Sequence, residues 1–470
     1  MLESFDWFVL AYFVVLNSSY LLLIGVAAHD TARAHRRPAT AGYDDVFANP
    51  LTPAISVLVP AHDEEVLIVD SVRSMFALRY PHFEVVVVDD GSTDGTFEAL
   101  RAEFDLIEVA PDFDAVVPTI GQVRSVHVPR DGLALVVVRK EGAGSRADAI
   151  NVAINAAHHP LVCCVDADSI LERDALLQVA KPFVDDPERV IASGGTIRAV
   201  NGSAVYRGQL STVRHPRNWL VRIQILEYLR SFLLGRTAWS KLGALMIISG
   251  AFGLYRRDRL VEAGGFDPRS MAEDADVLLT LHKLERDAGR AYRAVFIAVP
   301  VCWTEVPSNR QILARQRVRW SYGLAQVLWK RRSMMLNPRY GRIGMVTLPY
   351  YLAFELLGAA VELVGVVAVI AGLWFGAVNL EYAALFAVVA FLYGIAVSLA
   401  AVLVEEVSFH RYDRWRDLGA TVVASVLENI GYRQLHAWWR LKGLLKAMRG
   451  SEPAWGVMTR TGFTAEEVTA

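Results

Sequence analysis

Two long apolar stretches constrain this chain most, because each is long enough to cross a lipid bilayer. Phe5–Ala28 and Ile343–Phe375 both exceed the roughly 20 residues that a helix needs to span the hydrocarbon core. A third stretch, Tyr382–Val404, follows the second after a few residues, so residues 343–404 are expected to form a transmembrane hairpin. Hydrophobic residues make up 53% of the 470 residues, which favours a membrane protein over a purely soluble one.

The charges that flank the first stretch predict its orientation. Its start is acidic, with Glu3 and Asp6, and basic residues such as Arg33 follow its end. A signal peptide has the opposite arrangement, with basic residues at its start. Because basic flanks stay in the cytoplasm, we expect a transmembrane helix within residues 1–30 and a cytoplasmic domain after it.

Two acids, Glu355 and Glu362, stand inside the second apolar stretch and should share one helix face. Acids in a membrane are costly and face either a polar path or a partner. We therefore expect either a pore-lining role or packing against Arg or Tyr of a neighbouring helix. Because Leu418–Leu427 is short, residues 405–470 are expected to form an interfacial or partly inserted helix and a basic cytoplasmic tail.

Residues 51–300 have the pattern of a soluble α/β domain. Apolar, strand-like runs alternate with helical patterns, which predicts βαβ units and a parallel sheet. The strand-like runs are Ile55–Val59, Glu84–Val88, Ala134–Val138 and Leu161–Val165, and the helical patterns are Glu65–Leu78, Gly95–Ala102 and Arg146–Ala157. Residues 109–132 are expected to be an insertion. Residues 218–248 combine Trp, Leu and Arg at helical spacing, which favours an amphipathic segment at a membrane surface.

Acidic pairs follow two of the predicted strands, at the edge where α/β sheets bind ligands. Asp89 and Asp90 suit hydrogen bonds to a base or ribose, whereas Asp94 is expected only to cap the next helix. Asp166 and Asp168 point the same way if the strand stays extended. Two such carboxylates are hard ligands that suit Mg²⁺ or Mn²⁺ together with a diphosphate. In the alternative, Asp168 caps a helix over Ile170–Ala180.

Three further motifs carry chemistry. The Gly-rich loop "EGAGSRADAIN" leads into a helix at Arg146, and both the helix start and the arginine favour an anion. Acids at a helix start are also favoured by the helix dipole, which accounts for Glu273. Asp274 beside it is a candidate base for a sugar hydroxyl. Finally, "QRVRW", at residues 316–320, combines Gln, Arg and Trp at near-helical spacing.

In this order, the motifs resemble those of the membrane-embedded, processive family-2 glycosyltransferases, which include cellulose, hyaluronan, chitin and poly-N-acetylglucosamine synthases. The motifs concerned are "VPAHDEE", "VVVVDDGSTDGT", "CVDADS", "SGAFGLYRRD", "GGFD", "AED" and "QRVRW". The resemblance covers about Ile55–Trp320. It implies a GT-A-type (Rossmann-like) α/β domain inserted between transmembrane helices, with amphipathic interface helices and a Q-x-x-R-W helix region at residues 301–335.

The resemblance also implies roles for individual residues. The nucleotide would be bound by His62, Glu64, Asp89, Asp90 and Arg146. A divalent metal, Mg²⁺ or Mn²⁺, would be held by Asp166 and Asp168, and Asp274 would be the catalytic base. The acceptor and the leaving diphosphate would be contacted by Glu273, Gln316, Arg319 and Trp320. The chain departs from many relatives at His62 and Asp63, where they carry Tyr-Asn, and at Arg146, where they carry Lys.

The implied activity is inverting transfer from a UDP-sugar, with N-acetylglucosamine as the leading candidate, into a β-linked polysaccharide that crosses the plasma membrane. Its partners would be the donor, a growing polysaccharide or lipid-linked acceptor, and the bilayer; an export partner is not defined by the sequence. The net charge of −2 gives no indication of nucleic-acid binding. The alternatives are transfer of one sugar to a lipid carrier and a channel with a nucleotide-sensing domain.

Overall fold

The computed structural model describes residues 2–35, 43–206, 209–214, 216–376, 381, 384–385, 388–409 and 415–452. The chain divides into two compact units. The described residues of 43–214 and 245–306 form what we call the α/β unit. The described residues of 2–35, 216–244 and 307–452 form the helical unit. The predicted interface segment, residues 218–248, therefore falls mostly in the helical unit.

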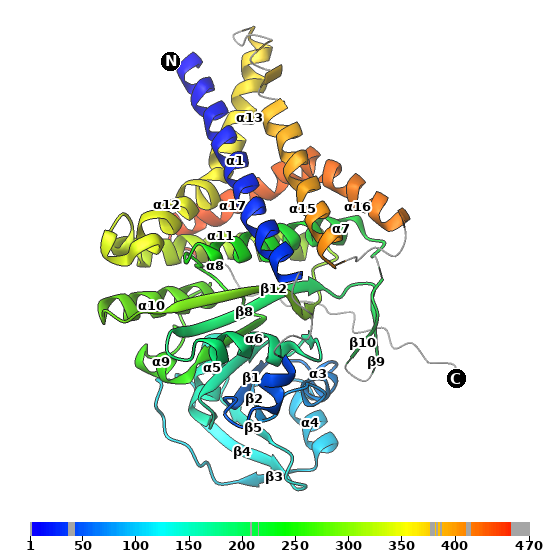
Figure 1. The fold of residues 1–470 in the computed structure, drawn as a ribbon, viewed down its shortest axis with the longest axis vertical. Coiled ribbons are helices and arrows are strands. Elements are labelled where there is room, and N and C mark those ends of the chain that lie inside the picture. Colours follow the sequence, from blue (N-terminus) through cyan, green and yellow to red (C-terminus); the bar gives the residue numbers. More distant parts are fainter. Residues whose placement is uncertain are drawn as a thin grey trace. The chain divides into compact units, whose positions relative to one another are not determined.

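A mixed β-sheet forms the centre of the α/β unit (Figure 1). Its order over the described residues is β3-β4-β5-β2-β1-β6-β11-β8-β12-β7. The strands are β1 (Ile55–Ala61), β2 (Phe83–Asp90), β3 (Leu106–Val109), β4 (Val123–Pro129), β5 (Leu135–Lys140), β6 (Leu161–Val165), β7 (Ile170–Leu171), β8 (Val190–Ala199), β11 (Phe252–Arg256) and β12 (Arg293–Thr304). The four strands predicted from apolar runs, β1, β2, β5 and β6, pair in parallel as expected.

The rest of the sheet is mixed: β8 and β12 also pair in parallel, but other strands depart from the parallel arrangement that the sequence pattern predicts. Strand β11 runs antiparallel to both β6 and β8, and β4 runs antiparallel to β3 and β5. Antiparallel neighbours need no helical crossover, so an alternation of strands and helices does not reveal them. Strand β4 lies within residues 109–132, so the predicted insertion contributes a strand to the sheet.

Helices cover the sheet (Figure 1). They are α2 (Tyr43–Ala48), α3 (Ile68–Phe76), α4 (Thr96–Phe104), α5 (Arg146–Ala156), α6 (Ala175–Asp185), α9 (Arg257–Glu262) and α10 (Glu273–Asp287). Helix α3 buries Ile68, Val72 and Met75, which recur at the spacing of one helix face. Helix α5 packs on β1 and β2, and α6 packs on β8 and β12.

The predicted helix over Ile170–Ala180 is wrong in its first half. Ile170 and Leu171 form the short strand β7, which pairs with β12, and α6 begins only at Ala175. Ile170 is fully buried in a cluster with Val200 and Trp303, so tertiary packing overrides the local helical pattern. Asp168 therefore does not cap this helix.

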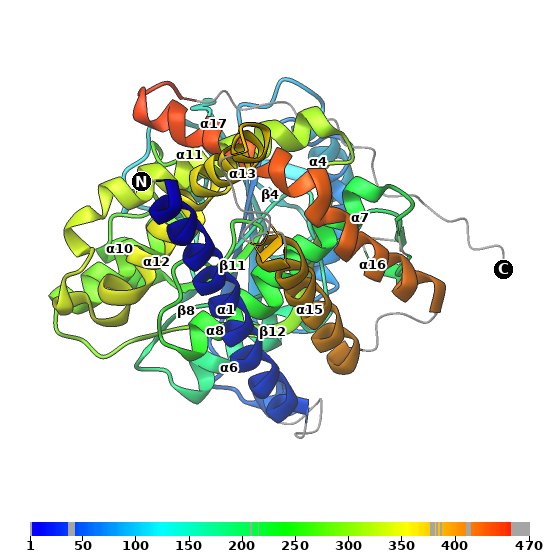
Figure 2. The same cartoon turned by 90° about the horizontal axis from the view of Figure 1, so that it is seen from above.

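The helical unit contains two helices, among the described residues, that are long and apolar enough to cross a membrane: Trp7–Asp30 and Ile343–Gly372. The first lies in α1 (Leu2–His35), and the second runs through η4 (Ile343–Thr347), α12 (Leu348–Tyr350), η5 (Tyr351–Leu356) and α13 (Gly358–Trp374). The predicted third span, Tyr382–Val404, lies partly outside the described residues. Its described end belongs to η6 (Val388–Leu392) and α15 (Tyr393–Phe409), and α15 packs against α1 (Figure 2).

The two acids of the second apolar stretch have partners within the helical unit. Glu355 accepts a hydrogen bond from the Tyr20 hydroxyl at 2.9 Å and lies 3.3 Å from the Arg440 guanidinium. Glu362 lies 2.9 Å from Arg433. Both arginines belong to α17 (Arg433–Met448), so the predicted alternative of packing against Arg and Tyr matches the contacts.

Further helices complete this unit. They are α7 (Trp219–Tyr228), η1 (Leu229–Arg236), α8 (Thr237–Lys241), α11 (Arg310–Lys330), α16 (Trp415–Leu427) and η7 (Glu428–Tyr432). Two of them, α11 and η7, pack against α17. Helix α17 meets α11 at Gly443, where a Cβ atom would lie 2.5 Å from the Val318 carbonyl oxygen. Close packing of these two helices therefore depends on the missing side chain.

We predict that Gly443→Leu destabilises the helical unit by about 1–3 kcal/mol or more, because the added side chain would collide with the backbone of α11. The control is Gly419→Ala on α16, where a Cβ atom has open space within 4 Å. It should leave stability unchanged or raise it by up to about 1 kcal/mol. Thermal unfolding of the purified protein in detergent measures both changes. Equal midpoints for the two variants would contradict this packing.

Candidate active site

The carboxyl ends of the parallel strands lie level at one edge of the sheet. The register places Ala61 of β1 opposite Asp89 of β2, and Asp90 opposite Lys140 of β5. In open α/β sheets, ligands bind just beyond this edge. The α/β unit contains most of the predicted site residues, namely His62, Glu64, Asp89, Asp90, Arg146, Asp166, Asp168, Glu273 and Asp274.

The predicted nucleotide-binding acids Asp89 and Asp90 are buried and already hold the loops at this edge. Asp89 accepts a hydrogen bond from the Ser92 backbone N–H at 2.9 Å and lies 3.6 Å from Arg139. Asp90 accepts from the backbone N–H of Ala143, in the Gly-rich loop, at 3.1 Å. These carboxylates fix the loop after β2 and the loop after β5.

Lys140 is a charged residue of this site that the sequence interpretation missed. It is 1% exposed and contacts the carboxylates of Asp90 and Asp148, the latter at 2.9 Å. Asp148 also accepts backbone hydrogen bonds from Ile120 at 2.6 Å and Gly121 at 3.2 Å. A lysine at the end of an apolar strand is the available sequence signal, but a solvated strand end gives the same pattern.

Arg146, the first residue of α5, joins three separate segments of the chain. Its Nε donates to Asp166 Oδ1 at 2.8 Å, its Nη1 to Glu273 Oε1 at 3.0 Å, and its Nη2 to the Gly250 carbonyl at 2.6 Å. Burial disfavours the charged guanidinium, but attraction to Asp166 and then Glu273 outweighs it and raises the pKa of Arg146. The arginine therefore stays charged as the centre of the cluster.

Asp274, the predicted base, lies at the start of α10 and belongs to the same cluster. Its Oδ2 accepts the Gly250 backbone N–H at 3.0 Å, and its Oδ1 accepts the Ala275 N–H at 2.8 Å. Gly250 thus donates to Asp274 and accepts from Arg146. Glu273 beside it is buried, and burial raises its pKa against the opposing pull of Arg146.

The predicted metal pair, Asp166 and Asp168, lies in a turn after β6, so the extended geometry expected between them does not persist. The Ser169 N–H donates to the Asp166 carbonyl at 3.1 Å. Arg146 contacts Asp166 with two nitrogens, Nε and Nη2, and both approach Oδ1. No group of three or more His, Cys, Asp or Glu in the described chain could hold a metal. A metal on this pair would therefore need further ligands, such as phosphate oxygens.

His62 and Glu64 follow β1 and contact the neighbouring loop. His62 Nδ1 lies 3.0 Å from the Asp90 carbonyl, and its side chain is half-exposed. The Glu64 backbone N–H donates to Thr96 Oγ1 at 2.8 Å. Asp94 accepts the Thr96 backbone N–H at 3.0 Å, but the N-cap position of α4 is Gly95, so Asp94 lies one residue before the cap position predicted for it.

Gln316, Arg319 and Trp320 lie on α11, in the helical unit. Trp320 is 41% exposed, and the Arg317 guanidinium carbon lies over its ring at 4.4 Å from the centroid. The predicted approach of these residues to the donor stays a prediction, because they belong to a different unit from Asp274.

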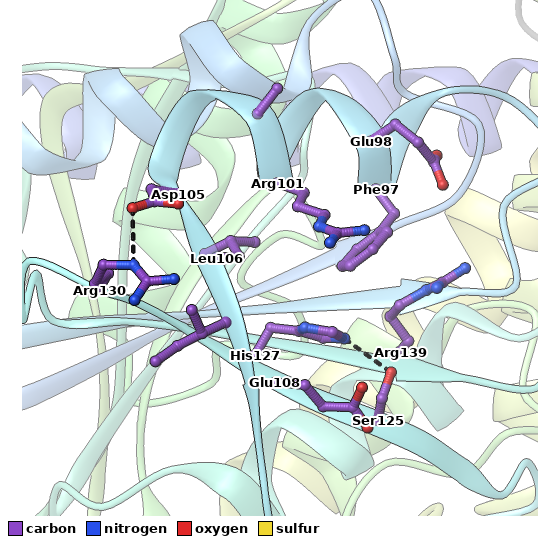
Figure 3. A pocket seen from close by; sticks show the side chains of 12 residues that line it. Phe97, Glu98, Arg101, Asp105, Leu106, Glu108, Ser125, His127, Arg130 and Arg139 are labelled. Atoms are coloured by element: carbon purple, nitrogen blue, oxygen red, sulfur yellow. Dashed lines mark hydrogen bonds and ion pairs between the residues drawn. The ribbon is translucent and has the colours of Figure 1, made fainter.

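A cavity of about 740 Å³ lies beside α4, at the edge formed by β3, β4 and β5 (Figure 3). Its charged lining residues are Glu98, Arg101, Asp105, Glu108, Arg130 and Arg139. Three acids face three arginines, so the balance of charge favours neither an anion nor a cation. None of the predicted site residues lines it.

Comparison with solved structures shows the fold of the chain. The mannosyltransferase PcManGT from Pyrobaculum calidifontis, solved with GDP-Man and Mn²⁺, shares the fold with a TM-score of 0.53 and 22% identity. The similarity covers 90% of this chain and 99% of that chain. The α/β unit therefore has a GT-A-like glycosyltransferase fold with a mixed sheet.

Residues 53–323, more than half of the chain, match the family "Glycosyltransferase like family 2", and the chain belongs to that family of nucleotide-sugar glycosyltransferases. Poly-beta-1,6-N-acetyl-D-glucosamine synthase of Staphylococcus aureus (strain COL) is 28% identical over 274 residues, which are 58% of this chain and 55% of the relative. The synthase of Staphylococcus epidermidis shows the same identity and coverage. The match thus spans about half the length of these curated relatives.

We predict that Lys140→Met destabilises the α/β unit by about 3–5 kcal/mol, because it leaves Asp90 and Asp148 buried without a cation. The matched control is Lys181→Met, which removes a more exposed partner of Asp185 and should cost at most about 1 kcal/mol. Thermal unfolding followed by circular dichroism compares the two. A similar midpoint for both variants would show that Lys140 is not needed at this edge.

Proposed function

We propose that the chain is a metal-dependent, inverting glycosyltransferase that uses a UDP-sugar, with UDP-N-acetylglucosamine as the leading donor. The observation that carries the proposal is the cluster in which Arg146 and Gly250 link Asp166 to Asp274. It brings a candidate metal ligand and a candidate base together from segments far apart in the sequence. The name of the staphylococcal relatives supports N-acetylglucosamine as the sugar.

In this proposal, Asp274 accepts the proton of the acceptor hydroxyl. The N–H groups of Gly250 and Ala275 fix the orientation of its carboxylate. The hydroxyl oxygen attacks the anomeric carbon while the nucleoside diphosphate leaves from the opposite side. An α-linked donor therefore gives a β-linked product.

Asp166 and Asp168 would hold Mg²⁺ or Mn²⁺ together with the donor diphosphate. When bound, the ion would offset negative charge on the leaving diphosphate. The Mn²⁺ in the structure of similar fold supports this assignment. Because Arg146 is engaged with Asp166, Glu273 and a carbonyl, we propose that it orients Asp166 and Glu273.

We further propose that the enzyme extends a polysaccharide and moves it across the plasma membrane, with the α/β unit in the cytoplasm. Two candidate membrane helices and the polymer named for the relatives support this. The second candidate is transfer of one sugar to a lipid carrier. Product sizing after incubation with UDP-N-acetylglucosamine separates the two, because only a polymerase yields a ladder of chains.

We predict that Asp274→Asn lowers transfer by about 10²–10⁴-fold while nucleotide affinity stays unchanged, because only proton removal is lost. The control is Asp287→Asn at the other end of α10, where the exposed carboxylate pairs with Lys283. It should leave transfer unchanged. UDP release and equilibrium binding of UDP measure the two quantities, and near wild-type turnover of Asp274→Asn would refute the assignment.

We predict that EDTA abolishes transfer and that Mn²⁺ or Mg²⁺ restores it. Asp168→Asn should raise the metal concentration needed for half-maximal activity at least about tenfold, because a carboxylate ligand is lost. The control is Asp174→Asn, which changes a partly exposed acid a few residues after Asp168. Full activity in EDTA would overturn the metal assignment.

A further inference from the structure

Arg317 lies inside the "QRVRW" segment, and none of the roles given above uses it. It is 5% exposed, so its guanidinium is almost fully withdrawn from water. Two of its contacts join it to Glu227 and to Trp320. Its Nη2 donates to Glu227 Oε2 of α7 at 2.5 Å, and its central carbon lies over the Trp320 ring at 4.4 Å from the centroid.

The spacing of the two residues on α11 explains the ring contact. Residues three apart lie on the same helix face, so a flat guanidinium at position 317 reaches the indole at position 320. A guanidinium over an aromatic face is attracted by the ring quadrupole, more so when the pair is shielded from water. One face of Trp320 is thereby covered, while the side chain as a whole stays 41% exposed.

Glu227 is itself held in place from the C-terminal segment. Its Oε1 accepts a hydrogen bond from the Tyr432 hydroxyl at 3.2 Å and lies 3.9 Å from His436 Nδ1. The rings of Tyr432 and His436 stack with an interplanar angle of 8°. The carboxylate that anchors Arg317 is therefore fixed by a second element.

The backbone next to Trp320 is fixed as well. Ser321 Oγ donates to the Arg440 carbonyl of α17 at 2.7 Å, and Gly443 allows α17 to approach Val318 and Ser321 closely. Helix α11 thus cannot slide or rotate at this point without breaking contacts. The side chain of Trp320 can still rotate about its own bonds, and the Arg317 contact limits that rotation.

We propose that Arg317, anchored by Glu227, is a positioning residue that fixes the Trp320 ring as a stacking surface for the acceptor sugar. The inference rests on the proposed function in taking a sugar as the acceptor, and on the predicted contact of Trp320 with that acceptor. Lysine cannot replace this arginine, because an ammonium offers no flat face to the ring. Loss of the contact should loosen the ring without removing it.

The test uses a paired change that keeps the fold. Replacing a buried ion pair by apolar side chains is often neutral for stability, so Arg317→Met with Glu227→Met should unfold near the wild-type temperature. Calorimetry in detergent, without donor, measures the binding of a short β-linked N-acetylglucosamine oligosaccharide. We expect the paired change to raise the Kd for this oligosaccharide by about 2–30-fold. Arg315→Lys, an exposed arginine on the same helix, is the control.

Two further variants make the result decisive. Arg317→Lys keeps the charge and removes only the flat face, so it tests the inference even if the paired variant does not fold. It should also raise the Kd for the oligosaccharide. In a Trp320→Leu background, the paired change should have no additional effect on the Kd, because Arg317 acts through the ring. If the paired change raised the Kd further in that background, the effect would come from the fold in general, and the inference would be overturned.

The inference and the proposed function fail in different ways. Absence of UDP release by the wild-type protein with every donor would refute the transferase proposal. An oligosaccharide Kd that the Arg317 variants leave unchanged, or no oligosaccharide binding by the wild type, would refute the role of Arg317. Weaker binding in these variants, with unchanged affinity for UDP, would support it.

Discussion

The candidate site depends on one partly buried arginine. Arg146 donates to a carboxylate at the tip of β6, to a carboxylate at the start of α10 and to the Gly250 carbonyl before β11. Removal of such a cation would leave the buried Glu273 and the partly buried Asp166 without their shared positive charge, which costs most at the buried carboxylate. The geometry of Asp274 follows from the same contact, because the glycine that accepts from Arg146 also donates to Asp274.

Sequence patterns predict the half of the sheet that carries the site. Four apolar runs give β1, β2, β5 and β6 with their parallel pairing, since each is a largely apolar run that is followed within a few residues by charged ones. Strand β7 could not be predicted in this way, because two residues form a strand only when a partner such as Trp303 is already in place. The same holds for Lys140, whose two carboxylate partners are set by the fold and not by spacing.

The helical unit shows a similar limit. The sequence indicates that Glu355 and Glu362 need partners, since carboxylates in an apolar helix are costly without them. It does not indicate which partners, because Arg440 and Arg433 are more than seventy positions away in the chain. Their pairing shows that two of the basic side chains of α17 are used inside the unit. The basic tail is therefore a weaker guide to topology than the positive-inside rule assumes.

Arg146 in the α/β unit and Arg317 in the helical unit each hold neighbouring side chains in a fixed orientation. Each arginine presents several donors in a fixed plane, so it can bind a carboxylate and still contact a second group. Arg146 orients acids, whereas Arg317 orients an aromatic ring, and in both cases the anchoring carboxylate comes from a distant segment. A loose base or a loose stacking surface would bind its ligand only part of the time, so rigid anchoring raises the fraction of molecules in a productive geometry. The costly burial of two charges is thus explained by positioning rather than by stability.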